Sequence, residues 1–362
     1  MDLTKFLNLA GMLAFSLAFF APSAAAALPA DFSKMYVFGD SLSDTGNVAL
    51  MPNGPALLSG RYEAGRFTNG AAWVDGVANA VGINPAHLVP SLSAQASPAN
   101  FAANYSINFA YGGAATGVEN TTPDGLFHVR GLLGQAADFG ALAAQAGGLS
   151  DAAHSLFTVW AGANDYLLAG APGTGIPSPP VVADVVANVR DSIQSLYADG
   201  ARNFIVPTLP DMGNVPIIAA LGGPAAQAYY TALGQAHNAL LEQTLYALMR
   251  MDPGIKFYSP DIFGLYDSVQ SNPSAFGFGH SLTDFGPATG CLLLPPHDCS
   301  ALGTGFNGEG YATWDEEHPS AAMHGLIADR ALAAGALVPE PATWALFLAG
   351  GGALAARRRR RA

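Results

Sequence analysis

Short apolar runs rich in aromatic and β-branched residues alternate along the chain with longer segments whose apolar residues recur at helical spacing. The clearest helical segments are residues 180–200, which end in Gly200, and residues 224–250, which begin with a proline. The short runs predict five strands, at residues 34–38, 106–110, 155–162, 203–208 and 255–259. Such alternation is typical of a mainly parallel sheet with helices on both faces. In these sheets, functional groups collect at the carboxyl ends of the strands.

Three segments rich in glycine, proline or asparagine fit neither pattern and are predicted loops: residues 47–70, 169–180 and 268–310. Loops this long in a compact domain often form lids or binding walls. No repeat with a period of about 20 to 50 residues is present, which argues against a solenoid or a propeller. Half of the 362 residues are hydrophobic and 12% are charged, which is unlike a disordered chain.

The first 27 residues read as an export signal. They combine Lys5, a long apolar stretch and a run of small residues from Ala24 to Ala27. These three features predict a secretory signal peptide that is cleaved near residue 27. An uncleaved membrane anchor is the alternative, but it would not explain the small residues from Ala24 to Ala27.

The last 25 residues, 338–362, have a three-part layout. The sequence Pro339-Glu340-Pro341 precedes an apolar stretch at residues 342–356, and five arginines follow at residues 357–361. The apolar part is shorter than the roughly 20 residues of a comfortable membrane span, and the arginines favour the cytoplasmic side. This layout resembles the PEP-CTERM sorting signal. The resemblance implies transient anchoring in the inner membrane and removal by an exosortase in a Gram-negative bacterium; a plain C-terminal anchor is the alternative.

The domain between these ends, residues 28–337, is strongly acidic. The whole chain has 15 basic and 27 acidic residues, a net charge of −12. Removal of both ends, with Glu340 retained, leaves nine basic and 26 acidic residues, a net charge of −17. Such a surface repels nucleic acids and anionic membranes, so we expect no nucleic-acid partner.

Two cysteines lie close together in the third predicted loop. Cys291 and Cys299 are the only cysteines of the chain. Because an exported protein meets an oxidising compartment, we predict a local disulfide between them. A redox pair or a metal site fits less well, since no further cysteine exists and His297 alone cannot complete four ligands.

Small and polar residues follow the first predicted strand, in the stretch GDSLSDTGN. Ser41 in this stretch is either a residue that caps a helix, a position that serine favours, or a nucleophile at the sheet edge. A serine hydroxyl becomes a nucleophile when a histidine, oriented by a carboxylate, takes its proton. His318 follows Asp315 by three residues, a spacing that lets one turn bring the two side chains together. The sequence thus offers Ser41, His318 and Asp315 as a candidate triad.

Two positions just past predicted strands are candidates for an oxyanion hole, which needs preorganised hydrogen-bond donors. Gly113 follows residues 106–110 and offers a backbone N–H, unless it serves only close backbone packing. Asn164 follows residues 155–162 and offers a side-chain amide, unless it is a turn residue. The N–H of Ser41 would be a third donor.

Four blocks occur along the chain in a fixed order. They are Gly39-Asp40-Ser41-Leu42, the stretch NFAYGGA with Gly113, Gly162-x-Asn164-Asp165, and Asp315-x-x-His318-Pro319. Together they resemble the GDSL, or SGNH, hydrolases. The stretches FGDSLSDTGN and GRFTNGAAWVD resemble the branch of secreted lecithinase/haemolysin-like esterases and plant GDSL lipases. The resemblance covers about residues 35–330.

The resemblance implies a fold and a set of roles. The fold is a flavodoxin-like SGNH three-layer α/β/α sandwich with a mainly parallel five-stranded sheet. Ser41 is then the nucleophile, and Asp315 and His318 complete the triad. Gly113 and Asn164 are then the oxyanion donors beside the Ser41 N–H.

The implied activity is hydrolysis of carboxylic esters, including lipids, through an acyl-enzyme and without a metal or organic cofactor. We expect it in the periplasm, at the cell surface or in the medium. Acyl transfer and O-deacetylation of an extracellular polysaccharide are alternatives. A non-catalytic matrix protein on a hydrolase scaffold is a third, and the presence of Ser41, His318 and Asn164 together argues against it.

Several polar neighbours of the four blocks are expected to have other roles. Asp44 and Asn47 are predicted to tie down the loop beneath Ser41. Asp165 and His324 are predicted to be structural. Glu316 and Glu317 are expected to be solvated, unless one of them replaces Asp315 as the carboxylate that orients the histidine.

Overall fold

The computed structural model describes residues 28–338, except residues 30, 55–61, 104, 124, 126 and 290–308. The predicted signal peptide, the disulfide between Cys291 and Cys299 and the C-terminal tail lie outside the described residues, so these remain predictions from the sequence. No helix of the described part is long and apolar enough to cross a membrane.

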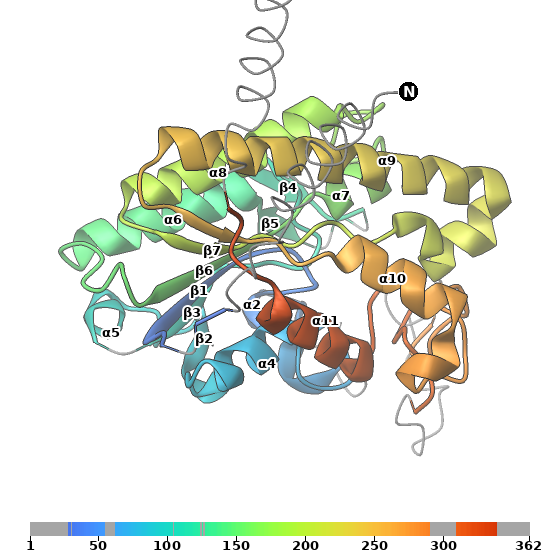
Figure 1. Ribbon diagram of the computed structural model, residues 1–362, viewed down its shortest axis with the longest axis horizontal. Helices are drawn as coiled ribbons and strands as arrows, with labels where there is room; N and C mark the ends of the chain where they lie inside the picture. Colours follow the sequence, from blue (N-terminus) through green and yellow to red (C-terminus); the bar gives the residue numbers. More distant parts are fainter. Residues whose placement is uncertain are drawn as a thin grey trace, which may run out of the picture.

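Six parallel strands form the central sheet, in the order β2-β3-β1-β6-β7-β8 (Figure 1). Their bounds are β1 (Lys34–Gly39), β2 (Leu88–Pro90), β3 (Ser106–Asn108), β6 (Ser155–Trp160), β7 (Asn203–Ile205) and β8 (Lys256–Tyr258). The predicted α/β class is confirmed, and each of the five predicted strands is present. The sheet has one strand more than predicted, β2, which pairs with β3 at the edge.

The strand order places a switch point at β1. After β1 the chain forms β2 and then β3 on one side of it, and later β6 on the other side. The carboxyl ends of β1, β3 and β6 therefore meet at one edge of the sheet. Loops that leave neighbouring strands in opposite directions form a crevice at such a point, where ligands of open α/β sheets bind.

Helices cover both faces of the sheet (Figure 1). One face carries α5 (Pro98–Ala102), α6 (Leu132–Gln145), α8 (Val182–Ala198) and the C-terminal half of α9 (Pro216–Met251). The other face carries α4 (Trp73–Ala80), α10 (Ile262–Ser271) and α11 (Ala321–Ala333). The shorter elements are α2 (Asn47–Leu50), α7 (Ala163–Leu167), β4 (Glu119–Thr121), β5 (His128–Arg130), η1 (Glu63–Gly65), η2 (Pro85–His87), η3 (Met212–Asn214) and η4 (Pro273–Phe276).

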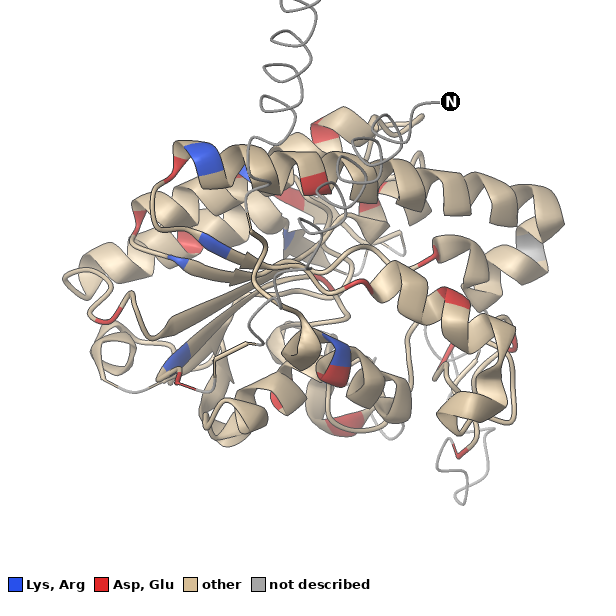
Figure 2. Cartoon of the chain, viewed as in Figure 1, with Lys and Arg blue, Asp and Glu red and all other residues tan. Residues whose placement is uncertain are grey.

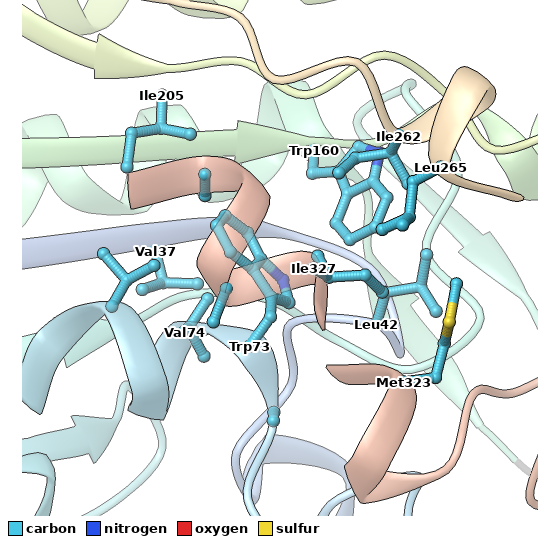
Figure 3. Close-up of a cluster of buried hydrophobic side chains, with 14 of the residues drawn as sticks. Val37, Leu42, Trp73, Val74, Trp160, Ile205, Ile262, Leu265, Met323 and Ile327 are labelled. Atoms are coloured by element: carbon cyan, nitrogen blue, oxygen red, sulfur yellow. The ribbon is translucent and has the colours of Figure 1, made fainter. Parts of the chain in front are cut away.

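Alternating residues of β1 supply both hydrophobic cores. Met35 and Val37 point to the side of α4 and α11, and Tyr36 and Phe38 point to the side of α6 and α8. Both faces of a central parallel strand are buried, which explains its uninterrupted apolar sequence. Figure 3 shows the core between the sheet and the helices α4 and α11. In this core, the rings of Trp73 and Trp160 meet edge to face with centroids 5.5 Å apart.

The long helix α9 is broken near its start. Gly223 has φ 60° and ψ −164°, outside the helical region, and Pro224 follows it. The main part of α9 therefore begins at Pro224, where the sequence predicted it. The residues before the break, from Pro216, follow η3 and lie near the candidate site.

The described residues after α11, 334–338, lie against the sheet, and we call them the strap. Within the strap, Ala336 forms an antiparallel bridge with Tyr258 of β8. The N–H of Leu337 donates to the carbonyl of Phe257 at 2.7 Å. The strap therefore belongs to the folded domain, whose described residues extend to Val338.

Candidate active site

Ser41 lies in a turn directly after β1. The strand ends at Gly39, where an added Cβ would lie 2.1 Å from the carbonyl oxygen of Trp160, so only glycine fits. The next residue, Asp40, organises the turn: its side chain accepts from the N–H of Leu42 at 3.0 Å. The first helix after the strand begins only at Asn47 with Gly46 as its N-cap, so Ser41 does not cap a helix.

Ser41, His318 and Asp315 form one chain of hydrogen bonds. His318 Nε2 lies 2.8 Å from Ser41 Oγ, although 277 residues separate them in sequence. His318 Nδ1 lies 2.8 Å from Asp315 Oδ2. Asp315 and His318 are buried, and Ser41 is half-buried. The structure thus brings the three predicted side chains together in the predicted order.

The segment that carries Asp315 and His318 is a closed loop rather than a helical turn. Thr313 and Pro319 form an antiparallel bridge, and the N–H of Trp314 donates to the carbonyl of His318 at 2.7 Å. Inside this loop, Asp315 Oδ1 accepts from the N–H groups of Glu317 and His318 at 2.8 and 2.7 Å. The carboxylate is therefore fixed by its own loop, which orients Oδ2 toward the imidazole.

Asp44 and Asn47 hold the loop beneath Ser41, as predicted. Asp44 accepts from the N–H groups of Gly46, Asn47, Val48 and Gly112 at 2.7 to 3.1 Å. The amide of Asn47 donates to the carbonyls of Asn108 and Ala110, both at 2.8 Å. These bonds join the loop after β1 to the segment after β3.

The two predicted oxyanion donors lie in connected loops. Asn164 is buried at the start of α7 and donates one amide hydrogen to the carbonyl of Ala114 at 3.0 Å. Gly113 has φ +76°, a conformation that favours glycine. Among the described residues, none accepts a hydrogen bond from the Gly113 N–H. Asn164 lines the same pocket as Ser41 and His318, and Gly113 is not among the residues that line that pocket.

Asn120 in β4 fixes the turn that contains Gly113. Its amide donates to the carbonyl of Gly113 at 2.9 Å, and its carbonyl oxygen accepts from the N–H of Ala115 at 2.9 Å. The short hairpin of β4 and β5 thus supports one predicted oxyanion donor. The sequence analysis did not single out Asn120, because nothing local marks an asparagine in a three-residue strand.

Asp165 and His324 have the structural contacts that the sequence predicted. Asp165 accepts from the N–H and the hydroxyl of Thr116 at 2.9 and 2.7 Å. His324 Nδ1 accepts from the N–H of Trp73 at 3.2 Å. Neither side chain takes part in the hydrogen-bond chain of Ser41.

The expectation that Glu316 and Glu317 are solvated was wrong. Glu316 is fully buried, and the Glu317 side chain is only 17% exposed. Both are drawn inward because the bridge between Thr313 and Pro319 closes the loop. Neither replaces Asp315 at Nδ1; instead, Glu317 Oε1 lies 3.7 Å from Nε2, the nitrogen that faces Ser41.

Charges around His318 favour its protonated form. Burial lowers the pKa of His318, but the charge and hydrogen bond of Asp315 and the charges of Glu317 and Asp40 raise it above its ordinary value. Burial raises the pKa of Asp315, and the nearby His318 more than offsets this and lowers it. Burial also raises the pKa of Glu317 and of Asp40, each to about 7.

A mostly apolar pocket lies beside Ser41. Its polar lining residues are Asp40, Ser41, Asn164, Glu317 and His318. Its apolar lining residues are Leu42, Ala163, Leu167, Pro210, Met212, Val215 and Tyr266. The empty volume, including the part open to solvent, is about 440 Å³. Such a surface suits an apolar group next to Ser41. In the described part of the chain, no cluster of three or more His, Cys, Asp or Glu side chains could hold a metal ion.

Two aromatic residues that the sequence analysis did not assign lie against Asp315 and His318. The hydroxyl of Tyr62 donates to Asp315 Oδ2 at 2.8 Å. The ring of Phe67 packs on the imidazole of His318 with centroids 5.2 Å apart. Both come from the stretch around GRFTNG, whose resemblance to a known block was the available signal.

Comparisons with known proteins identify the family of this chain. Residues 35–331 match the family described as GDSL-like lipase/acylhydrolase, and residues 337–361 match the PEP-CTERM protein-sorting motif. Two GDSL esterases/lipases of Arabidopsis thaliana are 28% and 27% identical to this chain. Their alignments each cover 82% of this chain and, in turn, 87% and 88% of the relative. A catalytic mutant of an acetylxylan esterase from Geobacillus stearothermophilus matches with a TM-score of 0.39 and 14% identity, over 84% of this chain and 94% of that one.

The family match covers most of the chain, including every block that carries Ser41, Gly113, Asn164 and His318. This chain therefore belongs to the GDSL-like lipase/acylhydrolase family of hydrolases and carries a PEP-CTERM sorting motif at its C-terminal end.

Proposed function

We propose that the chain is an exported serine esterase in which Ser41 is the nucleophile, His318 the general base and Asp315 the residue that orients the base. The observation that carries this proposal is the continuous hydrogen-bond chain from Ser41 Oγ through the imidazole to Asp315 Oδ2. With the ring proton on Nδ1, held by Asp315, the lone pair of Nε2 faces Ser41 Oγ, as a general base requires.

In the first half of the reaction, His318 Nε2 takes the Ser41 proton while Oγ attacks the ester carbonyl carbon. The carbonyl oxygen becomes an anion, and the N–H groups of Ser41 and Gly113 and the amide of Asn164 donate to it. The tetrahedral intermediate then expels the alcohol, which receives the proton from His318. Ser41 is left as an acyl ester.

In the second half, water takes the place of the alcohol. His318 removes a proton from the water as its oxygen attacks the acyl carbon. Collapse of the second tetrahedral intermediate releases the carboxylic acid and returns the proton to Ser41 Oγ. An alcohol in place of water would give acyl transfer by the same steps.

The pocket supports an apolar acyl chain as the group recognised beside Ser41. Leu167, Met212, Val215 and Tyr266 line it with apolar surface. Glu317 adds a carboxylate next to Nε2, which disfavours anionic substrates and favours departure of the anionic product. We therefore infer neutral esters with an apolar acyl group as the preferred substrates.

The chain's destination follows from its sorting motif. A PEP-CTERM motif implies export and processing by an exosortase. We infer that residues 28–337 form the enzyme, that the C-terminal segment anchors it in the inner membrane only until processing, and that the enzyme then acts at the cell surface or in the medium.

The test combines covalent labelling with hydrolysis. A fluorophosphonate probe should label the wild-type chain on the peptide that contains Ser41, and p-nitrophenyl esters should be hydrolysed. Ser41→Ala should abolish the labelling and lower kcat by at least about 10⁴-fold. Ser33→Ala, at an exposed serine just before β1, is the matched control and should behave as the wild type.

The outcomes separate the alternatives. Labelling that survives in Ser41→Ala would contradict the assignment of the nucleophile. Release of acetate from an acetylated polysaccharide in preference to the p-nitrophenyl esters would replace the apolar acyl substrate with O-deacetylation. A folded wild-type chain with neither labelling nor turnover would indicate a non-catalytic scaffold.

A further inference from the structure

The hydroxyl of Tyr62 shares one oxygen of Asp315 with the imidazole of His318. Tyr62 donates to Asp315 Oδ2 at 2.8 Å, and His318 Nδ1 lies 2.8 Å from the same atom. The other oxygen, Oδ1, is occupied by two backbone N–H groups of its own loop. Tyr62 therefore makes the one side-chain contact, among the described residues, that competes with His318 for the charge of the carboxylate.

This contact is buried and its direction is settled. Tyr62 is 6% exposed and Asp315 is fully buried. Burial and the charges and hydrogen bond of Asp315 raise the pKa of Tyr62 above its ordinary value. The phenol therefore stays protonated and is the donor of this hydrogen bond. A hydrogen bond to a charged acceptor is stronger than one between neutral groups.

The segment around Tyr62 is anchored so that it reaches both members of the acid–base pair. The ring of Tyr62 lies edge to face with Phe67, with centroids 6.4 Å apart, and Phe67 packs on His318. The N–H of Glu63 donates to the carbonyl of Thr68 at 2.8 Å, which closes a loop over residues 62–68. We call residues 62–68 the anchoring loop. A bidentate ion pair of Arg66 with Asp75 ties it to α4.

We propose that Tyr62 is a positioning residue that fixes Asp315 Oδ2 and reduces the negative charge that His318 experiences. The inference rests on the proposed function, because it assigns a role within that triad. A donor on Oδ2 spreads the carboxylate charge, so the imidazolium is stabilised less than it would be by an unshared carboxylate. Tyr62 thereby keeps His318 neutral, and able to act as a base, over a wider pH range.

Other titratable groups that affect the protonation of His318 and of Tyr62 come from several elements. Around the imidazole they are Asp40 from the turn after β1, Glu317 from its own loop and His324 from α11. Around the phenol they are Glu316 and Glu317. None of these carboxylates is removed by a change at Tyr62, so a change of the Tyr62 hydroxyl alone isolates its contribution.

The test compares Tyr62→Phe with Tyr111→Phe in the full folded chain. Both tyrosines are buried in the same hydrophobic cluster, and both substitutions remove one hydroxyl. The hydroxyl of Tyr111 contacts Ser91 at 3.3 Å instead of Asp315. A loss of packing or stability would therefore appear in both variants, and a loss of positioning only in Tyr62→Phe.

We expect Tyr62→Phe to move the acid limb of the kcat/KM profile to higher pH by about half a unit to one unit. At pH 7 this corresponds to a fall in kcat/KM of roughly three- to tenfold, and tenfold equals about 1.4 kcal/mol. KM should change less than kcat, because Tyr62 does not line the pocket. In proton NMR of the folded variant, the resonance of the His318 Nδ1 proton should move further downfield, because an unshared Oδ2 is a better acceptor.

Replacement of Tyr62 by 3-fluorotyrosine gives an opposite prediction and decides the matter if Tyr62→Phe does not fold. A fluorinated phenol is a stronger donor, so the acid limb should move to lower pH. An unmoved limb, a limb that moves the other way in either variant, or an equal shift in Tyr111→Phe would overturn the proposal. Because the assignment of the nucleophile is tested separately by Ser41→Ala labelling, failure here leaves that result intact.

Discussion

At the scale of single residues, spacing alone does not distinguish the proposed catalytic histidine from another one. Asp151 and His154 have the same three-residue spacing as Asp315 and His318, and their side chains also meet, at 2.9 Å. That pair is partly exposed on the surface and bonds to Ser33. Burial and the approach of Ser41 separate the two pairs, and only the order of the sequence blocks anticipated this.

Which residues lie together in the site could be predicted where the signal is local and not where it is distant. Ser41, Asn164 and His318 stand in short blocks that the sequence displays. Tyr62 contacts Asp315 across 253 residues, and Glu317 is half-buried in a loop that closes on itself. No pattern of neighbouring residues encodes such contacts, because they depend on how loops from different strands pack together.

Glu317 gives a second prediction about the pH profile, opposite in sign to that of Tyr62. Its ionised carboxylate near Nε2 helps to raise the pKa of His318. Because the base must be neutral to accept the serine proton, activity rises with pH as His318 loses its proton. Glu317→Gln removes the charge, so the pKa of His318 falls and the acid limb of kcat/KM should move to lower pH by roughly half a unit to one unit.

The measurement is kcat/KM for one neutral ester between acidic and alkaline pH. Asp191→Asn, at an exposed acid on α8, is the control for a general change in net charge and should leave the limb in place. If the acid limb of Glu317→Gln stays at the same pH or moves to higher pH, the carboxylate does not act on the imidazole.

At the scale of elements, the sequence pattern predicted five strands because each contains a short run rich in aromatic and β-branched residues. The edge strand β2 is three residues long, ends in Pro90 and pairs on one side only, so its signal is too short to recognise. The start of the main part of α9 at Pro224 was predicted, because proline can begin a helix but not continue one, whereas the helical residues before Gly223 were not predicted. The hairpin of β4 and β5 was not predicted, since its pairing depends on the loops that it supports.

The strap after α11 gives a prediction at this scale. Truncation after Ala333 removes the bridge of Ala336 to Tyr258, the hydrogen bond of Leu337 to Phe257 and the apolar contacts of these residues with both cores. A lost hydrogen bond and partial exposure of a leucine together cost about 2 kcal/mol. The free energy of unfolding in urea should fall by about this amount relative to truncation after Val338. Equal midpoints would show that the strap contributes no stability.

At the scale of the whole molecule, charge and sorting separate the domain from its ends. Figure 2 shows acidic residues at positions spread over the helices of both layers, with few basic residues among them. Five of the 15 basic residues lie together at residues 357–361, beyond the domain. A domain so acidic is repelled by an anionic membrane surface, so we propose that the terminal segment is the part that anchors the chain in the membrane before processing.

The last prediction concerns that segment. The family match ends at residue 331, the described residues end at Val338, and the PEP-CTERM match covers residues 337–361. Truncation after Val338 keeps every described contact of the domain, so esterase activity per molecule should equal that of the full chain. Its location should change, because the truncated chain lacks the segment on which an exosortase acts.

The experiment expresses three forms in a Gram-negative host that has an exosortase: the full chain, the truncation after Val338, and full-length Glu340→Ala. Esterase activity is then measured in the membrane, surface and medium fractions. The truncated form should appear in the soluble exported fractions without the processing step. Glu340→Ala retains the apolar stretch and the arginines but alters the motif, so its activity should accumulate in the inner membrane. Normal sorting of Glu340→Ala would show that an apolar stretch with a basic end suffices. Loss of activity on truncation after Val338 would show that the segment belongs to the enzyme itself, because a sorting signal that is cleaved off cannot be needed for turnover.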